Sequence, residues 1–230
     1  MNEKTWQKVE EAAKESIKHP GANKKPLPKD KVKKGQHFIL IFRHGESTDN
    51  VKKLFSGWRD PDLTEKGRQQ ALALAPKLKA LAAKGLDLEL VITSDQRRSK
   101  ETAKLALAHY PEIVNWEEDW RIKERNYGDL AGKSKEEAMR LNPDQAIKWR
   151  RGYDTSPPNG ESLQMVEKRV IPFLKELIKR VQNEHIDVAL SMHGNSMRVA
   201  RKFFEKMDLA EELTHENPLG NDYALYVIRA

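Results

Sequence analysis

Residues 37–47 read HFILIFRHGES, and this stretch decides the fold. Phe38 to Phe42 form a short, continuous apolar run, which is typical of a strand buried on both faces of a sheet. A charged loop that contains a glycine follows at once, beginning with Arg43 and His44. The stretch therefore predicts a central strand whose carboxyl end carries polar chemistry.

The rest of the chain alternates apolar strands with amphipathic helices. Further strands are expected at 88–93, 186–190 and 223–228. Helices are expected after Thr64, which can cap one, from about Gln96, from Ser162 to near Asn183, and from Ser196 to Met207. Strand, helix, strand order implies parallel crossovers. We predict an α/β fold, a three-layer α/β/α sandwich with a mostly parallel central sheet, helices on both faces and a small cap region.

Length and composition limit the possible classes of protein. The 230 residues suit one α/β domain with a short extension. The longest apolar runs are far too short to cross a bilayer, so no membrane association is expected. The chain has no cysteine, which excludes disulfides, thiolate nucleophiles and cysteine-ligated metals. This composition is compatible with a reducing compartment, and we expect a cytoplasmic protein.

Residues 1–36 are predicted to form an appendage to a main domain at 37–230. Trp6, Val9, Ala13 and Ile17 recur at near-helical spacing among Lys and Glu, and His19-Pro20-Gly21 would end this helix. The apolar stripe could dock on the domain. The Pro- and Lys-rich residues 24–29 predict an extended linker, with folded structure restarting near His37. A targeting peptide is the alternative, but a long apolar core is missing and several glutamates are present.

The formal charge of +7 lies mostly in this appendage. Residues 1–36 hold ten lysines against five acidic residues, which leaves 32 basic against 30 acidic residues in the remainder. A nucleic-acid-binding face would show a basic stripe with interleaved aromatic residues. Here the lysines alternate with glutamates as on solvated helices. We therefore expect no nucleic-acid partner, and a non-catalytic basic binding protein is the weakest alternative.

Basic and imidazole side chains follow three of the expected strands. Arg43-His44 follows the first, Arg97-Arg98 comes shortly after the second, and His193-Gly194-Asn195 follows a later one. Each group alone would be interpreted as a surface feature. Because ligands bind beyond the carboxyl ends of parallel strands, the three groups can converge on one crevice. Together they predict a cationic pocket suited to a dianionic phosphoryl group.

An imidazole nucleophile fits such a pocket. Nearby guanidinium groups disfavour a second positive charge, so a ring nitrogen of His44 stays free to attack phosphorus. Gly45 and Gly194 let the backbone approach the phosphate closely. A zinc site built from His44 and His193 is the competing interpretation, but no third ligand stands at a recognisable spacing and the arginines would repel a cation. We therefore expect no metal.

Arg43-His44-Gly45-Glu46 resembles the signature of the histidine phosphatase superfamily, whose members form a phosphohistidine intermediate. Residues 38 to about 228 further resemble the cofactor-dependent phosphoglycerate mutases of that superfamily. The segments that carry this second resemblance are 54–58 with 62–67, Thr93-Ser94 with Arg98, 124–130 continuing to Lys135, 149–153, 157–158 and 160–163.

This resemblance implies roles residue by residue. His44 would carry the phosphoryl group, and Glu124 would be the general acid and base. The residues implied to bind the moving phosphoryl group are Arg43, Arg98 and His193. Those implied to hold the remainder of the substrate or to line its pocket are Ser47, Asn50, Ser56, Gly57, Tyr127, Lys135, Arg150, Arg151, Gly194 and Asn195. Without the resemblance, Glu124 would be interpreted as a surface ion pair and Arg150-Arg151 as a solvated helix end.

The implied reaction interconverts 3-phosphoglycerate and 2-phosphoglycerate, a step of glycolysis and gluconeogenesis, with 2,3-bisphosphoglycerate as the cofactor that primes His44. The second alternative is a phosphatase of the same superfamily that acts on a small phosphoester. The paired arginines at 150 and 151 favour the mutase, because a mutase must also hold the phosphoryl group that is not transferred. A monomer and a homo-oligomer are both compatible with the sequence.

Two features depart from the mutase pattern. Ala230 follows the last expected strand at once, whereas many such mutases continue into a tail that helps close the site. We therefore expect appreciable phosphatase leakage, detectable as phosphate release alongside mutase flux. The loop at 217–222 also differs from the usual Pro-Thr-Gly-x-Pro pattern before the last strand.

Overall fold

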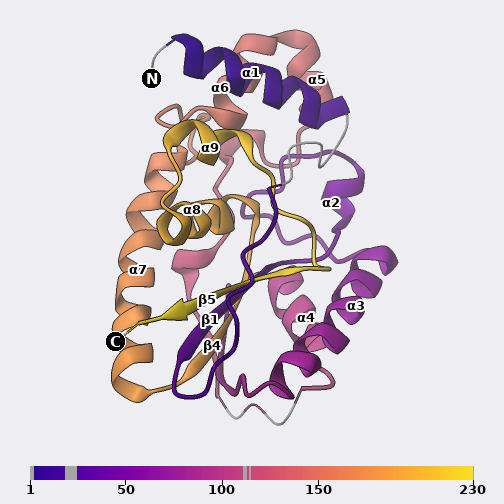
Figure 1. Ribbon diagram of the computed structural model, residues 1–230. Helices are drawn as coiled ribbons and strands as arrows, with labels where there is room; N and C mark the ends of the chain where they lie inside the picture. Colours follow the sequence, from indigo (N-terminus) through magenta and orange to yellow (C-terminus); the bar gives the residue numbers. More distant parts are fainter. Residues whose placement is uncertain (1–2, 19–24, 111–112, 114, 230) are drawn as a thin grey trace.

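The computed structural model describes residues 3–18, 25–110, 113 and 115–229, without the side chains of residues 16–18 (Figure 1). The side chain of Ile17, the predicted helix stop at residues 19–21 and the chain end at Ala230 lie outside this part. The described elements form a layered α/β fold (Figure 1).

A five-stranded sheet forms the middle layer. Its strands are β1 (His37–Arg43), β2 (Leu88–Thr93), β3 (Asn115–Glu118), β4 (Asp187–Met192) and β5 (Tyr223–Ile228). They lie in the order β3-β2-β4-β1-β5. The pairings among β1 to β4 are parallel, and β5 pairs antiparallel with β1. The predicted mostly parallel sheet is therefore confirmed.

Side chains of β1 alternate between two apolar cores, as the period of a strand requires. Ile39 and Ile41 join the core that α7 (Leu163–Glu184) and α8 (Gly194–Glu205) cover. Phe38, Leu40 and Phe42 join the core beneath α3 (Glu65–Ala82) and α4 (Arg97–Ala106). Figure 1 shows these helix pairs on opposite sides of the sheet, which confirms the three layers.

Three of the four predicted helix starts are confirmed. The hydroxyl of Thr64 accepts a hydrogen bond from the Gly67 amide at 3.0 Å, and Ser162 caps α7 in the same way through the Met165 amide at 3.2 Å. Gln96 is the residue before α4. The helix α8 begins two residues earlier than predicted, because His193 is its N-cap.

Sequence patterns miss several short elements. These are α2 (Thr48–Val51), β3, the 3-10 turns η1 (Trp120–Ile122) and η2 (Gly128–Leu130), the cap helices α5 (Lys135–Leu141) and α6 (Pro143–Arg151), and α9 (Leu209–Thr214). All four residues of β3 are exposed, so this edge strand has no apolar alternation to reveal it. The helices α5 and α6 are too short for a strong 3.6-residue pattern.

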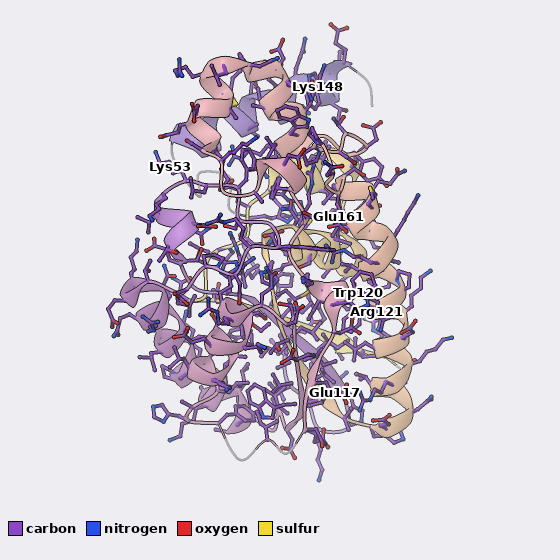
Figure 2. The ribbon with its side chains drawn as sticks, turned by 180° about the vertical axis from the view of Figure 1, so that it is seen from behind. Lys53, Glu117, Trp120, Arg121, Lys148 and Glu161 are labelled. Carbon is purple, nitrogen blue, oxygen red and sulfur yellow. The ribbon has the colours of Figure 1, made fainter. Side chains whose placement is uncertain are left out.

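Ion pairs attach this poorly patterned region to α7. Arg180 of α7 pairs with Glu117 of β3 at 2.8 Å, and Glu176 of α7 pairs with Arg121 at 2.6 Å. Seen from behind, Glu117, Trp120 and Arg121 follow the side of α7 (Figure 2). The segment between β3 and the cap thus takes its position from a helix far away in the sequence.

The N-terminal helix α1 (Glu3–Lys18) is present as expected and packs on the domain. Val9 and Ala13 are fully buried. Beyond it, the Leu225 amide donates to the Pro28 carbonyl at 2.9 Å, and the Asp30 amide donates to the Leu225 carbonyl at 3.1 Å. Residues 28–30 therefore pair with the outer edge of β5, ahead of the expected restart near His37. The division into an appendage and a main domain stays a prediction.

Within the described residues, no helix is both long enough and apolar enough to cross a membrane.

The central strand should dominate stability. We expect Leu40→Ala to lower the free energy of unfolding by about 3 kcal/mol, because Leu40 is fully buried and the cavity left behind cannot collapse completely. Leu72→Ala removes the same atoms from a side chain of α3 that is 37% exposed, and should cost less than about 1 kcal/mol. Urea denaturation measures both. Equal losses would contradict the assignment of Leu40 to the core.

Candidate active site

Two histidines meet where β1 and β4 end. The parallel register pairs Arg43 with Met192, and the His44 amide donates to the Met192 carbonyl at 3.1 Å. His44 follows β1 and His193 follows β4, and their ring centroids are 5.0 Å apart. Sheet pairing alone therefore brings together side chains that are 149 positions apart in the sequence.

The loop after His44 is held by close backbone contacts. A Cβ on Gly45 would lie 2.3 Å from the Gly67 carbonyl oxygen, and a Cβ on Gly67 would lie 2.1 Å from the Glu46 carbonyl oxygen. Neither neighbour can give way, because both are main chain. Gly45 was expected to let the backbone approach phosphate; here it lets the His44 loop pack against the first turn of α3.

His44 has a neutral ring with one nitrogen free of a proton. Its Nδ1 lies 2.7 Å from the Gly45 carbonyl, which accepts only from a protonated nitrogen, so the second ring nitrogen, Nε2, is left without a proton. Burial, followed by the charges of Arg98 and Arg43, holds the pKa of His44 well below its ordinary value. The same causes lower the pKa of His193, whose Nε2 lies 2.7 Å from the Ser94 hydroxyl.

Two buried guanidinium groups flank the histidines. Arg43 donates to the Asn217 carbonyl at 2.9 Å, and Arg98 donates to the carbonyls of Arg59 and Gly57 at 2.9 and 3.1 Å. Neither group has a carboxylate within ion-pairing distance among the salt bridges of the described residues. In that same part of the chain, the buried Nε atoms of both arginines have no hydrogen-bond acceptor. Such a pair offers its charge to an anion.

Glu124 is buried beside the histidines, not at the surface. Its carboxylate accepts hydrogen bonds from the amides of Arg125, Gly194 and Asn195 at 2.8 to 3.0 Å. Burial favours a raised pKa, but the Arg125 amide and the charge of Arg43 outweigh it and hold the pKa of Glu124 below its ordinary value. Glu124 is thus a carboxylate. Because it is buried, the interpretation of Glu124 as part of a surface ion pair is wrong.

A clamp on α7 places Glu124. Arg169 donates to the main-chain carbonyls of Arg121, Lys123 and Glu124 at 2.6, 3.0 and 3.0 Å. Nε and Nη2 of Arg169 also donate to the two carboxylate oxygens of Glu161, labelled in Figure 2, at 2.9 Å each. Arg169 therefore sets the path of a segment that has almost no regular secondary structure.

The site opens into a cavity of about 540 Å³ with a largely cationic lining. Arg150 and Arg151 belong to the last turn of α6, yet their side chains are only 13% and 4% exposed, so they are not a solvated helix end. Arg151 pairs with Glu216 at 2.6 Å. Eight arginines and lysines but only three glutamates among the described residues line the cavity, so an anionic ligand is favoured.

The structure brings almost all predicted site residues to this cavity. The following line it: Arg43, His44, Asn50, Ser56, Gly57, Arg98, Glu124, Tyr127, Lys135, Arg150, Arg151, Gly194 and Asn195. Two predicted residues, His193 and Ser47, are not among the residues that line the cavity. His193 packs against His44, and the buried Ser47 caps α2 by accepting a hydrogen bond from the Asn50 amide at 3.3 Å. The roles of all these residues stay predictions.

Arg198, Glu216 and Asn217 line the cavity but are missed by sequence patterns. Arg198 stands one helical turn after Gly194 on α8, and this spacing could have indicated it. Burial, then Arg151, lowers the pKa of Arg198 to about 9. Glu216 and Asn217 belong to the loop before β5, where no periodicity reports which side chains turn inward.

A metal-like cluster does exist here. Ligand atoms of His44, His193 and Glu124 lie within 4.8 Å of one another, so the expectation that no third ligand is available is wrong. The donor set nevertheless suits a cation poorly. The Glu124 oxygens already accept amide hydrogen bonds, and the charges of Arg43 and Arg98 lower the pKa of His44 and would repel a metal ion.

Comparison with known proteins agrees with this geometry. Residues 39–224 match the family model of the histidine phosphatase superfamily (branch 1). The chain belongs to this superfamily. It is similar to a 2,3-bisphosphoglycerate-dependent phosphoglycerate mutase of Methylobacterium sp. (strain 4-46), with 41% identity over 71% of this chain and 78% of the relative. A relative with the same name in Bartonella henselae is 36% identical over 79% and 88%.

Solved structures of the superfamily share the fold. Bacillus stearothermophilus YhfR aligns with a TM-score of 0.71 and 26% identity, over 82% of this chain and 90% of that protein. The mycobacterial glucosyl-3-phosphoglycerate phosphatase in complex with VO3 aligns with a TM-score of 0.70 and 25% identity over the same shares. Named relatives thus include both mutases and phosphatases.

The pH dependence of anion binding should report Lys135. Burial, followed by the charges of Arg150 and Arg43, lowers the pKa of Lys135 to about 7. Its amine is therefore charged below about pH 7 and neutral above it, so the affinity of the site for 3-phosphoglycerate, used as an anionic probe, should fall about tenfold from pH 7 to 9. Lys135→Arg keeps the charge at every pH in this range and should flatten the profile. An unchanged pH dependence in Lys135→Arg would exclude the Lys135 amine as the source of that pH dependence.

Proposed function

We propose that this enzyme interconverts 3-phosphoglycerate and 2-phosphoglycerate, with 2,3-bisphosphoglycerate as the primer of a phosphorylated His44. One observation carries the proposal: the cavity holds more cations than one phosphoryl group needs. Arg43 and Arg98 lie close enough to His44 to lower its pKa, and Lys135, Arg150, Arg151 and Arg198 line the same cavity. A simple phosphatase needs only the cations next to His44. An enzyme that holds a second anionic group of the same small molecule also needs the others.

His44 supplies the nucleophile in this proposal. The lone pair on Nε2 attacks phosphorus while Nδ1–H stays bonded to the Gly45 carbonyl. A phosphorus–nitrogen bond forms and the phosphorus–oxygen bond to the substrate breaks. Arg43 and Arg98 stabilise the charge on the phosphoryl oxygens, where positioning and electrostatics supply most of the catalysis.

Glu124 moves the proton. Its pKa is lowered, so Glu124 is a carboxylate and can accept the proton of the substrate hydroxyl that attacks the phosphorylated His44. A phosphoryl dianion placed beside it adds negative charge and raises its pKa, which favours the protonated form needed when a substrate oxygen leaves. The carboxyl group of Glu124 thus serves as the base in one transfer and as the acid in the other.

The residues fit 2,3-bisphosphoglycerate, which supplies the phosphoryl group for His44 when it is bound. In the part of the chain described here, the buried Nε atoms of Arg43, Arg98 and Arg198 have no acceptor, and all three residues line the cavity. The first two would hold the phosphoryl group next to His44. Lys135, Arg150 and Arg198 would hold the other anionic groups.

A phosphatase of this superfamily is the second candidate, since a phosphatase is among the similar solved structures. Purified protein with 3-phosphoglycerate, catalytic 2,3-bisphosphoglycerate and a chelator separates the two candidates. We expect 2-phosphoglycerate to form faster than inorganic phosphate is released. Phosphate release without 2-phosphoglycerate would support the phosphatase and reject the mutase.

His44→Ala should abolish this activity to below about 10⁻⁴ of the wild-type kcat, because His44 is the one histidine among the described residues that line the cavity. His109→Ala, in the exposed turn that follows α4, is the matched control and should retain wild-type rates. Acid-labile, base-stable phosphate should be recovered on wild-type protein incubated with 2,3-bisphosphoglycerate and not on His44→Ala. Equal labelling of both proteins would refute His44 as the carrier.

Glu124→Gln keeps the shape of the side chain but cannot exchange a proton. We expect kcat to fall about 10²- to 10⁴-fold with a smaller change in KM. Glu65→Gln at the exposed start of α3 is the control and should match wild type. Stopped-flow or coupled assays of 2-phosphoglycerate formation measure both variants. A kcat within twofold of wild type would remove Glu124 from the proton transfer.

A further inference from the structure

The helix α1 lies outside the residues that match the superfamily model, yet it packs against the cap. It crosses the end of the molecule that holds α5, α6 and α9 (Figure 1). Its apolar side is fully buried at Val9 and Ala13, and Val9 belongs to the same core as Leu213 of α9. Lys148 of α6, labelled at this end of the molecule in Figure 2, lines a small hollow together with Trp6 of α1.

A hydrogen bond connects α1 with the cavity. Nη1 of Arg150 donates to the main-chain carbonyl of Ala13 at 2.9 Å. Nη2 of the same guanidinium faces Glu216 at 3.8 Å, beyond hydrogen-bond distance. Arg150 lines the cavity and is 13% exposed, whereas none of the described side chains of α1, residues 3–15, lines it. The helix therefore stands behind Arg150 and does not cover the opening.

Arg150 needs such support. Burial, followed by the neighbouring charge of Arg151, lowers its pKa to about 10, which shows that its charged form is destabilised where it lies. Arg151 already takes the close position on Glu216 at 2.6 Å. The Ala13 carbonyl supplies Arg150 with a hydrogen-bond acceptor at 2.9 Å.

We propose that α1 is a positioning element for substrate recognition: the Ala13 carbonyl holds Arg150 where it meets the part of phosphoglycerate that is not transferred. The proposal rests on the proposed function in assigning that part of the substrate to Arg150. It predicts that undocking α1 weakens binding of 3-phosphoglycerate and leaves binding of a lone phosphate group, next to His44, unchanged.

Val9→Asp places a charge in the buried seam of α1 and should undock the helix. Isothermal titration calorimetry of the full chain with 3-phosphoglycerate should show Kd raised about tenfold, the effect of losing one hydrogen bond to a charged group. Kd for inorganic phosphate should stay within about twofold. Lys8→Asp changes the exposed neighbour in the same helix and should leave both constants unchanged.

Ala13→Leu is the second variant, in case Val9→Asp does not fold. Ala13 is fully buried, so the larger side chain must push its own carbonyl away from Arg150 while the seam stays apolar. The same selective loss of 3-phosphoglycerate affinity is expected.

A double-mutant cycle identifies the residue through which α1 acts. In an Arg150→Ala background, Val9→Asp or Ala13→Leu should cause no further loss of 3-phosphoglycerate affinity. Equal loss for both ligands, a full tenfold loss in the Arg150→Ala background, or no loss at all would each overturn the proposal. A wild-type chain that binds 3-phosphoglycerate but forms no 2-phosphoglycerate would refute the mutase function and leave this comparison valid.

Discussion

The parallel pairing of β1 with β4 is the constraint on which the site depends. The main-chain hydrogen bond from His44 to Met192 ends this ladder and sets His44 beside His193. Two-sided burial of both strands makes their register costly to shift, because a slip of one residue would turn every apolar side chain to the wrong face. Pairing of the two strands thus fixes the main chain of His44.

Buried charge is the second organising feature. Arg43, Arg98 and Glu124 are withdrawn from water, and each is held by main-chain groups of other segments. The same burial keeps both histidines neutral. Among the described residues the Nε atoms of both arginines have no acceptor, which a dianionic ligand would supply.

Much of the fold follows from patterns that are local in the sequence. The continuous apolar run of 38–42 and the capping hydroxyls of Thr64 and Ser162 predict their elements correctly, because burial on both faces and helix capping leave direct marks on neighbouring residues. The strand β3 and the helix α6 have only weak patterns of apolar residues in the sequence. Their positions come from ion pairs with α7 and from contacts with α1, which join residues far apart in the chain.

By itself, the sequence determined the strand-end signature, the order of the longer strands and helices, and the family resemblance around His44. Each of these depends on residues that are adjacent in the chain. Only the tertiary structure decided that Glu124 is buried, that Ser47 caps a helix behind the wall, that Arg198 and Glu216 enter the cavity, and that α1 reaches Arg150. These outcomes depend on which distant segments pack together and withdraw a side chain from water, and no local pattern encodes that.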